Sequence, residues 1–321
     1  MTLRQLEYFV GAVDAGTMSA AAENFVVSQS AISLAIAQLE RSLGSQLLLR
    51  SKARGLALTP AGAHLLTEAR RLLRSACELE SSARRLGNEV SGQLMVGMFP
   101  TLTPLVMPRI LREIADRHPA MRVDFQDGTT EHLQEWLLNG SCEVAVHFNL
   151  DTRPGIAVIP LFRARPYVVV SVDHPLADRS AVHLRDLAAF PGVLLDYRET
   201  TNWFDRLFLR AGVTPDVVHR ARDLESIRAL VARGIGWSIL VRGPLSDFGG
   251  EADPLCYLEI VDDQSIGGVW LEVVASVPDA TRLTARARAF IEFCIQIFAN
   301  ESVARPPEKA KLDCVPALYS A

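Results

Sequence analysis

Apolar residues recur every three or four positions in three separate runs near the N-terminus, and each run predicts a helix with one buried face. The first run covers residues 3–13. The second is short, covers residues 20–25 and has Ser19 as its expected cap. The third begins at its N-cap, Ser28, and ends before Gly44. Two helices joined by a tight turn, the second with a narrow outer face, predict a helix-turn-helix.

The outer face of the third predicted helix carries small, uncharged side chains. A helix that enters the DNA major groove, about 12 Å wide, needs a narrow face whose side chains donate or accept hydrogen bonds. Glutamine can pair with an adenine edge, and serine can reach a base or a phosphate. The alternative is a small helical bundle whose third helix simply has a small outer face. The residues expected to read bases are Gln29, Ser30, Ser33 and Leu34, and Ser28 is expected to hold a phosphate.

Two short apolar segments, residues 46–50 and 55–58, follow and predict a β-hairpin beside the helix-turn-helix. The tip of this hairpin is basic, and the stretch around it holds no acidic residue. A wing of this kind would place Arg50, Lys52 and Arg54 against the phosphate backbone or the minor groove. The alternative is a charged turn that is only solvated.

A long helix is predicted from Thr59, its N-cap, and Pro60, its first residue, to about Gly87. Leucines and alanines alternate along it at spacings of four and three, which is a heptad seam. Such a seam predicts a homodimer, although Leu66 and Leu73 could instead pack the helix onto its own domain. A dimer presents two recognition helices, as a palindromic DNA site requires. The seam consists of Leu65, Ala69, Leu72, Ala76, Leu79, Ala83 and Leu86.

Beyond residue 90, apolar runs of strand length alternate with helical ones, which predicts a doubly wound α/β fold. Ligands bind such sheets beyond the carboxyl ends of the strands. Several threonines there lie at predicted helix N-termini, where free N–H groups favour an anion such as a carboxylate. The alternative is that these residues only cap helices. The residues expected to bind the ligand are Thr101, Leu102, Thr103, Thr129, Thr130, Phe148, Thr201, Asn202 and Glu225.

The charge of the chain is uneven, so its net value of −4 does not exclude nucleic acid. Residues 1–91 hold ten basic and eight acidic residues, a net of +2, against 23 and 29, a net of −6, in the remainder. The five cysteines are scattered, form no CxxC and indicate reduced thiols in a cytoplasmic protein. No signal peptide, no apolar window of membrane-spanning length and therefore no membrane partner is expected.

The catalytic and cofactor motifs GxSxG, Walker A, GxGxxG and HExxH are all absent. The sequence therefore predicts no enzymatic activity and no cofactor. His147 has no second His, Cys or Asp at metal-ligand spacing, so it is expected to be a core or cleft-rim residue, and no metal site is predicted.

Taken together, the N-terminal motifs resemble those of the LysR-type transcriptional regulators, and the likeness extends to about residue 300. The family commonly has proline at the position of Ser30 and often a polar or basic residue at Leu34 and Ala35. Leu34 is therefore expected to touch a thymine methyl rather than make a charged contact. The matching segments are LRQLEYF at 3–9, AAE at 21–23, VSQSAIS at 27–33, LERSLG at 39–44, Arg50, and LTPAG at 58–62.

The pattern and the resemblance together predict an α+β multidomain chain. It would have an N-terminal winged helix-turn-helix, a long linker helix and a C-terminal two-lobed α/β domain of the periplasmic-binding-protein type. The expected boundaries are 1–59 for the DNA-binding domain, 60–89 for the linker and dimerisation helix, 90–300 for the effector domain, with lobe 1 at about 90–162 and 267–300 and lobe 2 at about 163–266, and 301–321 for a disordered tail.

The function that this implies is transcriptional control in response to a small effector, expected to be an organic acid, bound between the two lobes. Double-stranded DNA with a promoter inverted repeat is the expected partner, RNA polymerase is a further candidate, and the chain would form a dimer or a dimer of dimers. Two alternatives remain open. A redox-responsive regulator of the same family would need a cysteine pair in the second lobe, where only Cys256 lies. A solute-binding protein should carry a signal peptide and no helix-turn-helix.

Overall fold

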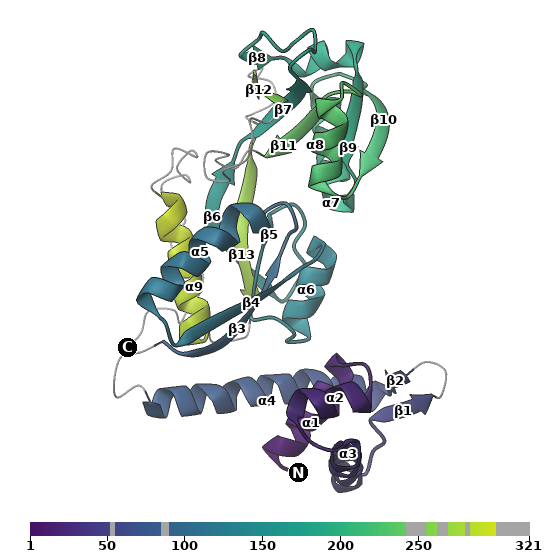
Figure 1. Cartoon of the computed structure of the whole chain (residues 1–321), viewed down its shortest axis with the longest axis vertical. Coiled ribbons are helices and arrows are strands. Elements are labelled where there is room, and N and C mark those ends of the chain that lie inside the picture. The colour runs from purple at the N-terminus through teal and green to yellow at the C-terminus, as the bar shows by residue number, and fades with distance from the viewer. Residues whose placement is uncertain (52–54, 85–89, 242–254, 262–268, 280–282, 300–321) are drawn as a thin grey trace.

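The computed structural model describes residues 1–51, 55–84, 90–241, 255–261, 269–279 and 283–299 (Figure 1). They form an N-terminal unit with a long helix, followed by two α/β lobes. In Figure 1 the long helix, α4, lies directly below the first lobe, and the second lobe stands at the far end of the molecule.

The N-terminal unit is a three-helix core with a two-stranded wing. Phe9, Ile32 and Leu39 are fully buried at its centre, which explains the three-to-four spacing of the apolar residues. The elements are α1 (Leu3–Asp14), α2 (Met18–Phe25), α3 (Gln29–Leu43), β1 (Leu48–Ser51), β2 (Gly55–Leu58) and α4 (Pro60–Arg84).

Side-chain caps fix where these helices begin. Ser28 caps α3 as predicted, because its hydroxyl accepts a hydrogen bond from the N–H of Ala31 at 3.2 Å. The expected cap of α2 was wrong. Thr17 rather than Ser19 caps this helix: its backbone is extended and its hydroxyl accepts from the N–H of Ala20 at 3.1 Å, so the helix begins two residues earlier.

The wing pairs as an antiparallel hairpin and is anchored to α3. The Glu40 carboxylate accepts hydrogen bonds from the N–H groups of Leu47 and Leu48, at 2.8 and 3.2 Å. Thr59 then caps α4, since its hydroxyl accepts from the N–H of Gly62 at 3.0 Å. The wing therefore has a fixed position relative to α3.

The first lobe is a five-stranded sheet in the order β4-β3-β5-β13-β6. The strands β3, β4 and β5 are parallel, whereas β13 is antiparallel to both β5 and β6. Helices α5 and α9 pack together on one face and α6 covers the other (Figure 1). The elements are β3 (Gly92–Met98), α5 (Thr103–Arg117), β4 (Met121–Asp127), α6 (Thr130–Leu138), β5 (Val144–Phe148), β6 (Ile156–Ala164), β13 (Leu271–Pro278) and α9 (Ala285–Ala299).

The second lobe is built from a four-stranded sheet, β11-β7-β12-β8, and a parallel pair, β9 and β10. Trp237 is fully buried in its core, and its indole N–H donates to the carbonyls of Leu187 and Phe190 at 3.0 and 2.9 Å. The elements are β7 (Pro166–Ser171), β8 (Ala181–Val182), a 3₁₀ helix (Leu184–Ala189), β9 (Pro191–Leu195), α7 (Arg198–Arg210), β10 (Asp216–Ala221), α8 (Leu224–Ala232), β11 (Ser238–Val241) and β12 (Leu255–Ile260).

The start of α7 differs from the prediction. The sequence predicts this helix over residues 203–211, but it begins at Arg198. Tyr197, whose backbone is extended, is its N-cap. Thr201 and Asn202 consequently lie inside the helix rather than at its first position. The predicted end of α4 near Gly87 and the tail beyond residue 300 lie outside the described residues.

No single helix of the described residues is long and apolar enough to cross a membrane. Helices α2 and α3 reach that measure only when taken together, and they are bent by 108° at the turn between them. Both contribute buried residues to the N-terminal core.

The turn between α2 and α3 gives a test of this fold. Val26 adopts the left-handed conformation, with φ 55°, which a β-branched residue rarely adopts, and its side chain is 89% exposed. Val26→Gly is therefore expected to raise the free energy of unfolding by about 1 kcal/mol, measured by chemical denaturation. Val27→Gly, at a half-buried position of ordinary φ, is the control and should lower it. A lower free energy of unfolding for Val26→Gly would show that the left-handed backbone of Val26 is not strained.

Candidate nucleic-acid interface and ligand cleft

The N-terminal half of α3 presents the small polar face that the sequence predicted. Gln29 and Ser30 are exposed, and Leu34 is 57% exposed. Ser33 is half-buried beside them, and the Ser28 and Ser30 hydroxyls lie 2.9 Å apart. On the opposite side the helix is buried in the N-terminal core. The five side chains, none of them charged, thus lie together at the N-terminal end of α3.

The three predicted basic side chains of the wing lie outside the described part of the structure, and only the backbone of Arg50 is described. Arg50 lies on β1, where its backbone pairs with Leu56, at the end of the wing that leads to its tip. Lys52 and Arg54 lie outside the described residues.

The heptad seam of α4 is divided between two environments. Its first part packs on the chain's own N-terminal core, where Ala69 is 2% exposed and Leu65 is half-buried. Leu66 and Leu73 join the same cluster. Further along, Leu72 and Leu79 are exposed, at 44% and 73%, with the half-buried Ala76 between them. The side chain of Ala83 and the whole of Leu86 lie outside the described part of the chain.

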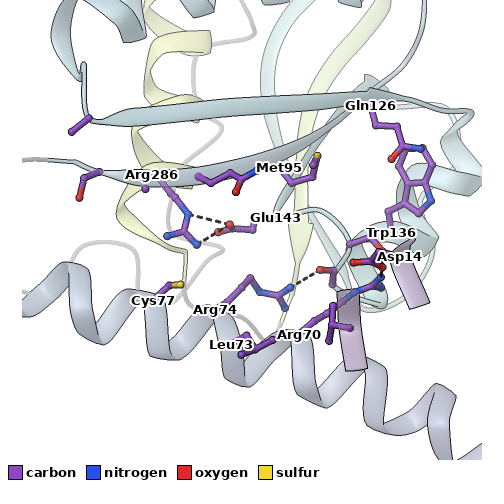
Figure 2. Close-up of a pocket in the computed structure, with 17 residues that line it drawn as sticks. Asp14, Arg70, Leu73, Arg74, Cys77, Met95, Gln126, Trp136, Glu143 and Arg286 are labelled. Carbon is purple, nitrogen blue, oxygen red and sulfur yellow. Dashed lines mark hydrogen bonds and ion pairs between the residues drawn. The ribbon is translucent and has the colours of Figure 1, made fainter. Parts of the chain in front are cut away.

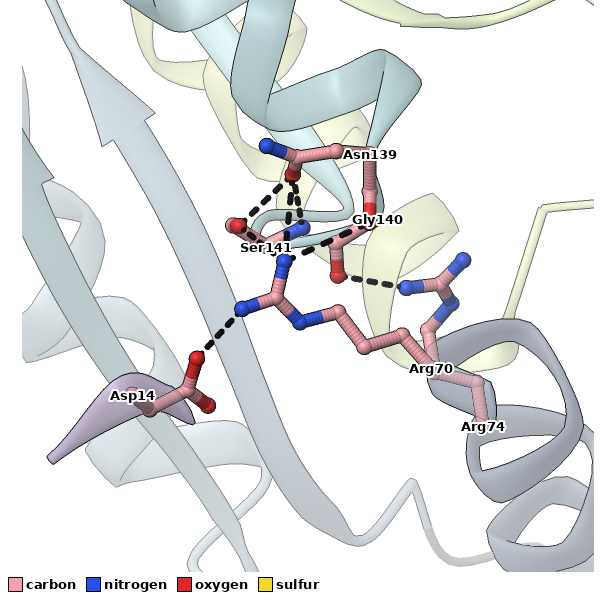
Figure 3. Close-up of polar contacts among 6 residues, drawn as sticks. All are labelled: Asp14, Arg70, Arg74, Asn139, Gly140 and Ser141. Atoms are coloured by element: carbon pink, nitrogen blue, oxygen red, sulfur yellow. Dashed lines mark hydrogen bonds and ion pairs between the residues drawn. The ribbon is translucent and has the colours of Figure 1, made fainter. Parts of the chain in front are cut away.

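Arginine side chains of α4 join the N-terminal unit to the first lobe. The Arg70 guanidinium donates to the Ser141 hydroxyl at 2.7 Å and to both oxygens of Asn139 at 3.4 Å, and it also pairs with Asp14 at the end of α1 (Figure 3). One turn later, Arg74 donates to the carbonyl of Gly140 at 2.7 Å. One loop of the first lobe, residues 139–141, is therefore held by two successive turns of α4.

A cavity of about 940 Å³ lies beside these contacts, between α4 and the β3–β4 side of the first lobe (Figure 2). Arg286 and Glu143, both nearly buried, form an ion pair at 2.9 Å in its wall. Arg74 also lines it, and burial lowers the pKa of this guanidinium, while the nearby charge of Glu143 opposes that effect. The arginines of this cavity are already engaged by the protein, so its wall serves as a domain junction.

A second concave region lies between the two lobes, and it has two chambers. The polar chamber, of about 260 Å³, is formed by the N-terminal turns of α6 and α7 and the loop after β5. The side chain of Gln134 holds that loop: its amide donates to the carbonyl of Asp151 and accepts from the N–H of Arg153. The polar chamber is lined by Thr130, Glu131, Gln134, Leu150, Asp151, Arg153, Arg198, Glu199, Asn202 and Arg206.

The apolar chamber, of about 30 Å³, is lined from both lobes and shares Leu150 with the polar one. Beside it, the rings of Phe99 and Phe148 in the first lobe and Tyr197 in the second form an edge-to-face series, with centroids 5.5 and 5.1 Å apart. The apolar chamber is lined by Thr101, Phe148, Leu150, Pro166, Leu195, Thr200, Trp203, Phe204, Leu224, Ile239, Leu240, Val241 and Leu271.

Four of the nine predicted ligand residues line these chambers: Thr101 and Phe148 the apolar one, Thr130 and Asn202 the polar one. The others serve the fold or lie outside. Leu102 is completely buried, Thr103 donates to Asp127, Thr129 caps α6, Thr201 is half-buried in α7, and Glu225 projects from α8 beside Arg228.

Sequence analysis did not select Glu199, Trp203 or the arginines of α7 as ligand residues. The cause is the late start predicted for α7. The buried spacing of Thr200, Phe204 and Leu207 continues one turn earlier than the predicted start, and this continuation is the signal that could have found them.

His147 is a core residue, as predicted. It is completely buried, its Nδ1 donates to the Phe148 carbonyl at 2.9 Å, and its Nε2 accepts from the Ser276 hydroxyl at 2.8 Å. Burial lowers its pKa, so the neutral ring is favoured. No group of three or more His, Cys, Asp or Glu with metal-binding geometry occurs among the residues that the structure describes.

The four described cysteines are free thiols. Burial raises the pKa of the Cys142 thiol to about 12 and raises that of Cys294 as well. Both are therefore poor nucleophiles. Cys77 is exposed on α4 and Cys256 is half-buried on β12 in the second lobe.

Comparison with known families identifies the class of protein. Residues 3–63 match the bacterial regulatory helix-turn-helix proteins of the lysR family, and residues 87–299 match the LysR substrate binding domain. The chain belongs to the LysR family and is a LysR-type transcriptional regulator with an effector-binding domain.

Relatives and solved structures extend over nearly the whole chain. The hydrogen peroxide-inducible genes activator of Pectobacterium carotovorum subsp. carotovorum is 31% identical over 264 residues, 80% of this chain and 85% of that protein. A full-length OxyR variant from Pseudomonas aeruginosa has a TM-score of 0.73 and 25% identity, covering 95% of this chain and 100% of that one. Full-length CbnR complexed with its target DNA has a TM-score of 0.56 and 27% identity, covering 92% and 99%. These neighbours confirm the predicted fold class.

The Arg70 contacts can be tested by hydrogen exchange. Arg70→Ala removes the charged hydrogen bonds that hold Asn139 and Ser141, so amide exchange of the 139–141 loop is expected to rise about tenfold. Arg71→Ala is the matched control, because Arg71 is exposed and its ion pair among the described residues is with Glu68 on its own helix. Equal exchange in the two variants would mean that Arg70 does not hold the loop.

Proposed function

We propose that this regulator binds promoter DNA with an inverted repeat through α3 and the wing of two paired subunits. The observation that carries this proposal is the uncharged, exposed face at the N-terminal half of α3, with Gln29 at its first turn. Recognition helices use these first residues to contact base edges. The likeness to CbnR, whose structure was solved with its target DNA, supports the same role for this chain.

The exposed part of the α4 seam supports pairing of two subunits. Leu72 and Leu79 lie seven residues apart and are exposed in the single chain, so a second α4 would cover them. Ala69 is already buried by the chain's own core, so the dimer contact is proposed for the C-terminal part of the seam. The further pairing of two such dimers is proposed from the likeness to the family alone.

The effector proposed for the cleft is a small carboxylate. Thr130 lies in the first turn of α6, and Arg198 and Arg206 line the same polar chamber. Helix N-termini and guanidinium groups both favour an anion. A cleft lined from both lobes lets one ligand change how they close, and the contacts of Arg70 and Arg74 offer a path from the first lobe to α1 and α4.

The remaining proposals follow from this function. The chain acts on DNA in the cytoplasm, and catalysis is not part of its role. The likeness to a hydrogen peroxide-inducible genes activator makes a redox sensor the second candidate function. Such a sensor would need a reactive cysteine pair, and Cys256 is the one cysteine of the second lobe. The ligand-responsive function is therefore preferred.

Base recognition by α3 can be measured in a binding assay on the operator DNA. Gln29→Ala is expected to weaken specific binding by about 1–3 kcal/mol, because a paired base edge loses its partner, while binding to unrelated DNA stays the same. Gln126→Ala, an exposed glutamine of the first lobe, serves as the control. Unchanged specific affinity for Gln29→Ala would remove this residue from base recognition.

The effector class can be measured by thermal shift of the full chain. The compounds are aliphatic, aromatic and amino-substituted carboxylates, each paired with its amide. A true effector at a hundred times Kd should stabilise the native state by about 2.7 kcal/mol, and its amide should stabilise it less. Stabilisation by amides alone would contradict a carboxylate effector.

A further inference from the structure

A buried carboxylate in the wall of the polar chamber has one oxygen without a hydrogen-bond partner. Glu199 is only 9% exposed, and its Oε2 atom accepts no hydrogen bond from any residue that the structure describes. The hydroxyl of Thr201, in the same helical turn, is likewise buried without a partner. Burying a carboxylate oxygen without a hydrogen bond is costly, so a donor from outside the chain, a water or a ligand group, would stabilise it.

The nearby histidine does not supply that donor. His147 uses Nδ1 on the Phe148 carbonyl and Nε2 on the Ser276 hydroxyl. Both ring nitrogens are thus engaged within the first lobe, and no proton of the ring is directed at Glu199.

The charges of the polar chamber are balanced rather than cationic. Three arginines and three carboxylates line it, and Arg153 and Glu131 pair with each other at 2.9 Å. Arg198 and Arg206 form no ion pair with any described residue, and both are exposed at the chamber. A simple anion would satisfy these two arginines but would leave Glu199 unpartnered and would be repelled by it. A ligand that carries both charges satisfies all three groups.

The two chambers lie along neighbouring faces of α7, which presents different residues to each. Glu199 and Asn202 face the polar chamber, whereas Thr200 and Trp203 face the apolar one. Leu150 lines both. The apolar chamber is the smaller of the two, at about 30 Å³, and its lining is mostly aliphatic and aromatic, so a short aliphatic group is the part of a ligand that matches it.

We propose that the effector is a zwitterionic α-amino acid with a short aliphatic side chain. Its carboxylate binds Arg198 and Arg206, its ammonium group donates to Glu199, and its side chain points toward Trp203. This inference rests on the proposed function of the cleft and adds to it the need for an ammonium group. An ammonium group has three donors and no acceptor, so it matches a carboxylate that lacks donors.

The test is calorimetric titration of the full chain with matched pairs of compounds. The amino acids are L-alanine, L-2-aminobutyrate, L-valine and L-leucine, and the partners are propionate, butyrate, 3-methylbutanoate and 4-methylpentanoate. The best amino acid is expected to bind at least about tenfold more tightly than its deaminated partner, as for the loss of a charge-assisted hydrogen bond.

Glu199→Gln is expected to abolish this preference and to leave the binding of the deaminated acid unchanged or stronger. Glu135→Gln, an exposed glutamate on α6 outside both chambers, is the matched control and should keep the preference. Without ligand, Glu199→Gln should melt at the same temperature as the parent chain or higher, because an unpartnered charge has been removed.

The outcomes separate this inference from the proposed function. If the deaminated acids bind as tightly as the amino acids, the zwitterion is wrong and the carboxylate effector stands. If no compound of either series binds, the aliphatic amino acid is wrong, and the thermal-shift series with aromatic carboxylates decides separately whether the carboxylate effector stands. If Glu199→Gln still binds the amino acid more tightly than its deaminated partner, the ammonium group does not bind Glu199 and its role is overturned. A lower melting temperature of that variant without ligand would show that Glu199 already has a partner in the protein, which also overturns its role.

Discussion

The return of the chain to the first lobe is the constraint on which the rest of the structure depends. Strand β13 lies between β5 and β6, although more than a hundred residues of the second lobe separate it from them. Buried polar contacts hold this return in register. Glu143 accepts from Arg286 and Thr284, and His147 accepts from Ser276. Because the second lobe is an insertion into the sheet of the first, the two lobes are tied together at their junction and leave a cleft beside it.

The same lobe also provides the surface on which α4 rests. Arg70, on α4, contacts two segments that are far from it in the sequence: the end of α1 at Asp14 and the loop at Ser141. Arg74 adds a hydrogen bond to a backbone carbonyl in a partly desolvated position. Partial burial makes such hydrogen bonds stronger than exposed ones and their loss more costly. A shift of the first lobe therefore has a direct mechanical connection to the helix that carries the DNA-binding unit.

The residue at which α7 begins decides which of its side chains line each chamber of the cleft. The start of α7 at Arg198 places the residues of its first two turns on neighbouring faces of the helix, so the charged side chains line one chamber and Trp203 lines the other. With the start at residue 203 that the pattern predicts, Thr201 and Asn202 are the only residues of this segment assigned to the cleft. The boundary of one helix thus decides whether the site is described as an anion site or as one with both charges.

Local patterns alone determined the three-helix core, the cap at Ser28, the hairpin and the uncharged face of α3, because each depends on residues only a few positions apart. They also indicated that the threonines at 101 and 130 lie at the ends of strands and helices. Only the tertiary structure decided that α4 buries Ala69 while exposing Leu79, that Arg70 bridges two units, and that Glu199 is buried without a partner. These features depend on which distant segments meet, and burial and hydrogen-bond partners across such distances are not encoded in the spacing of residues along the chain.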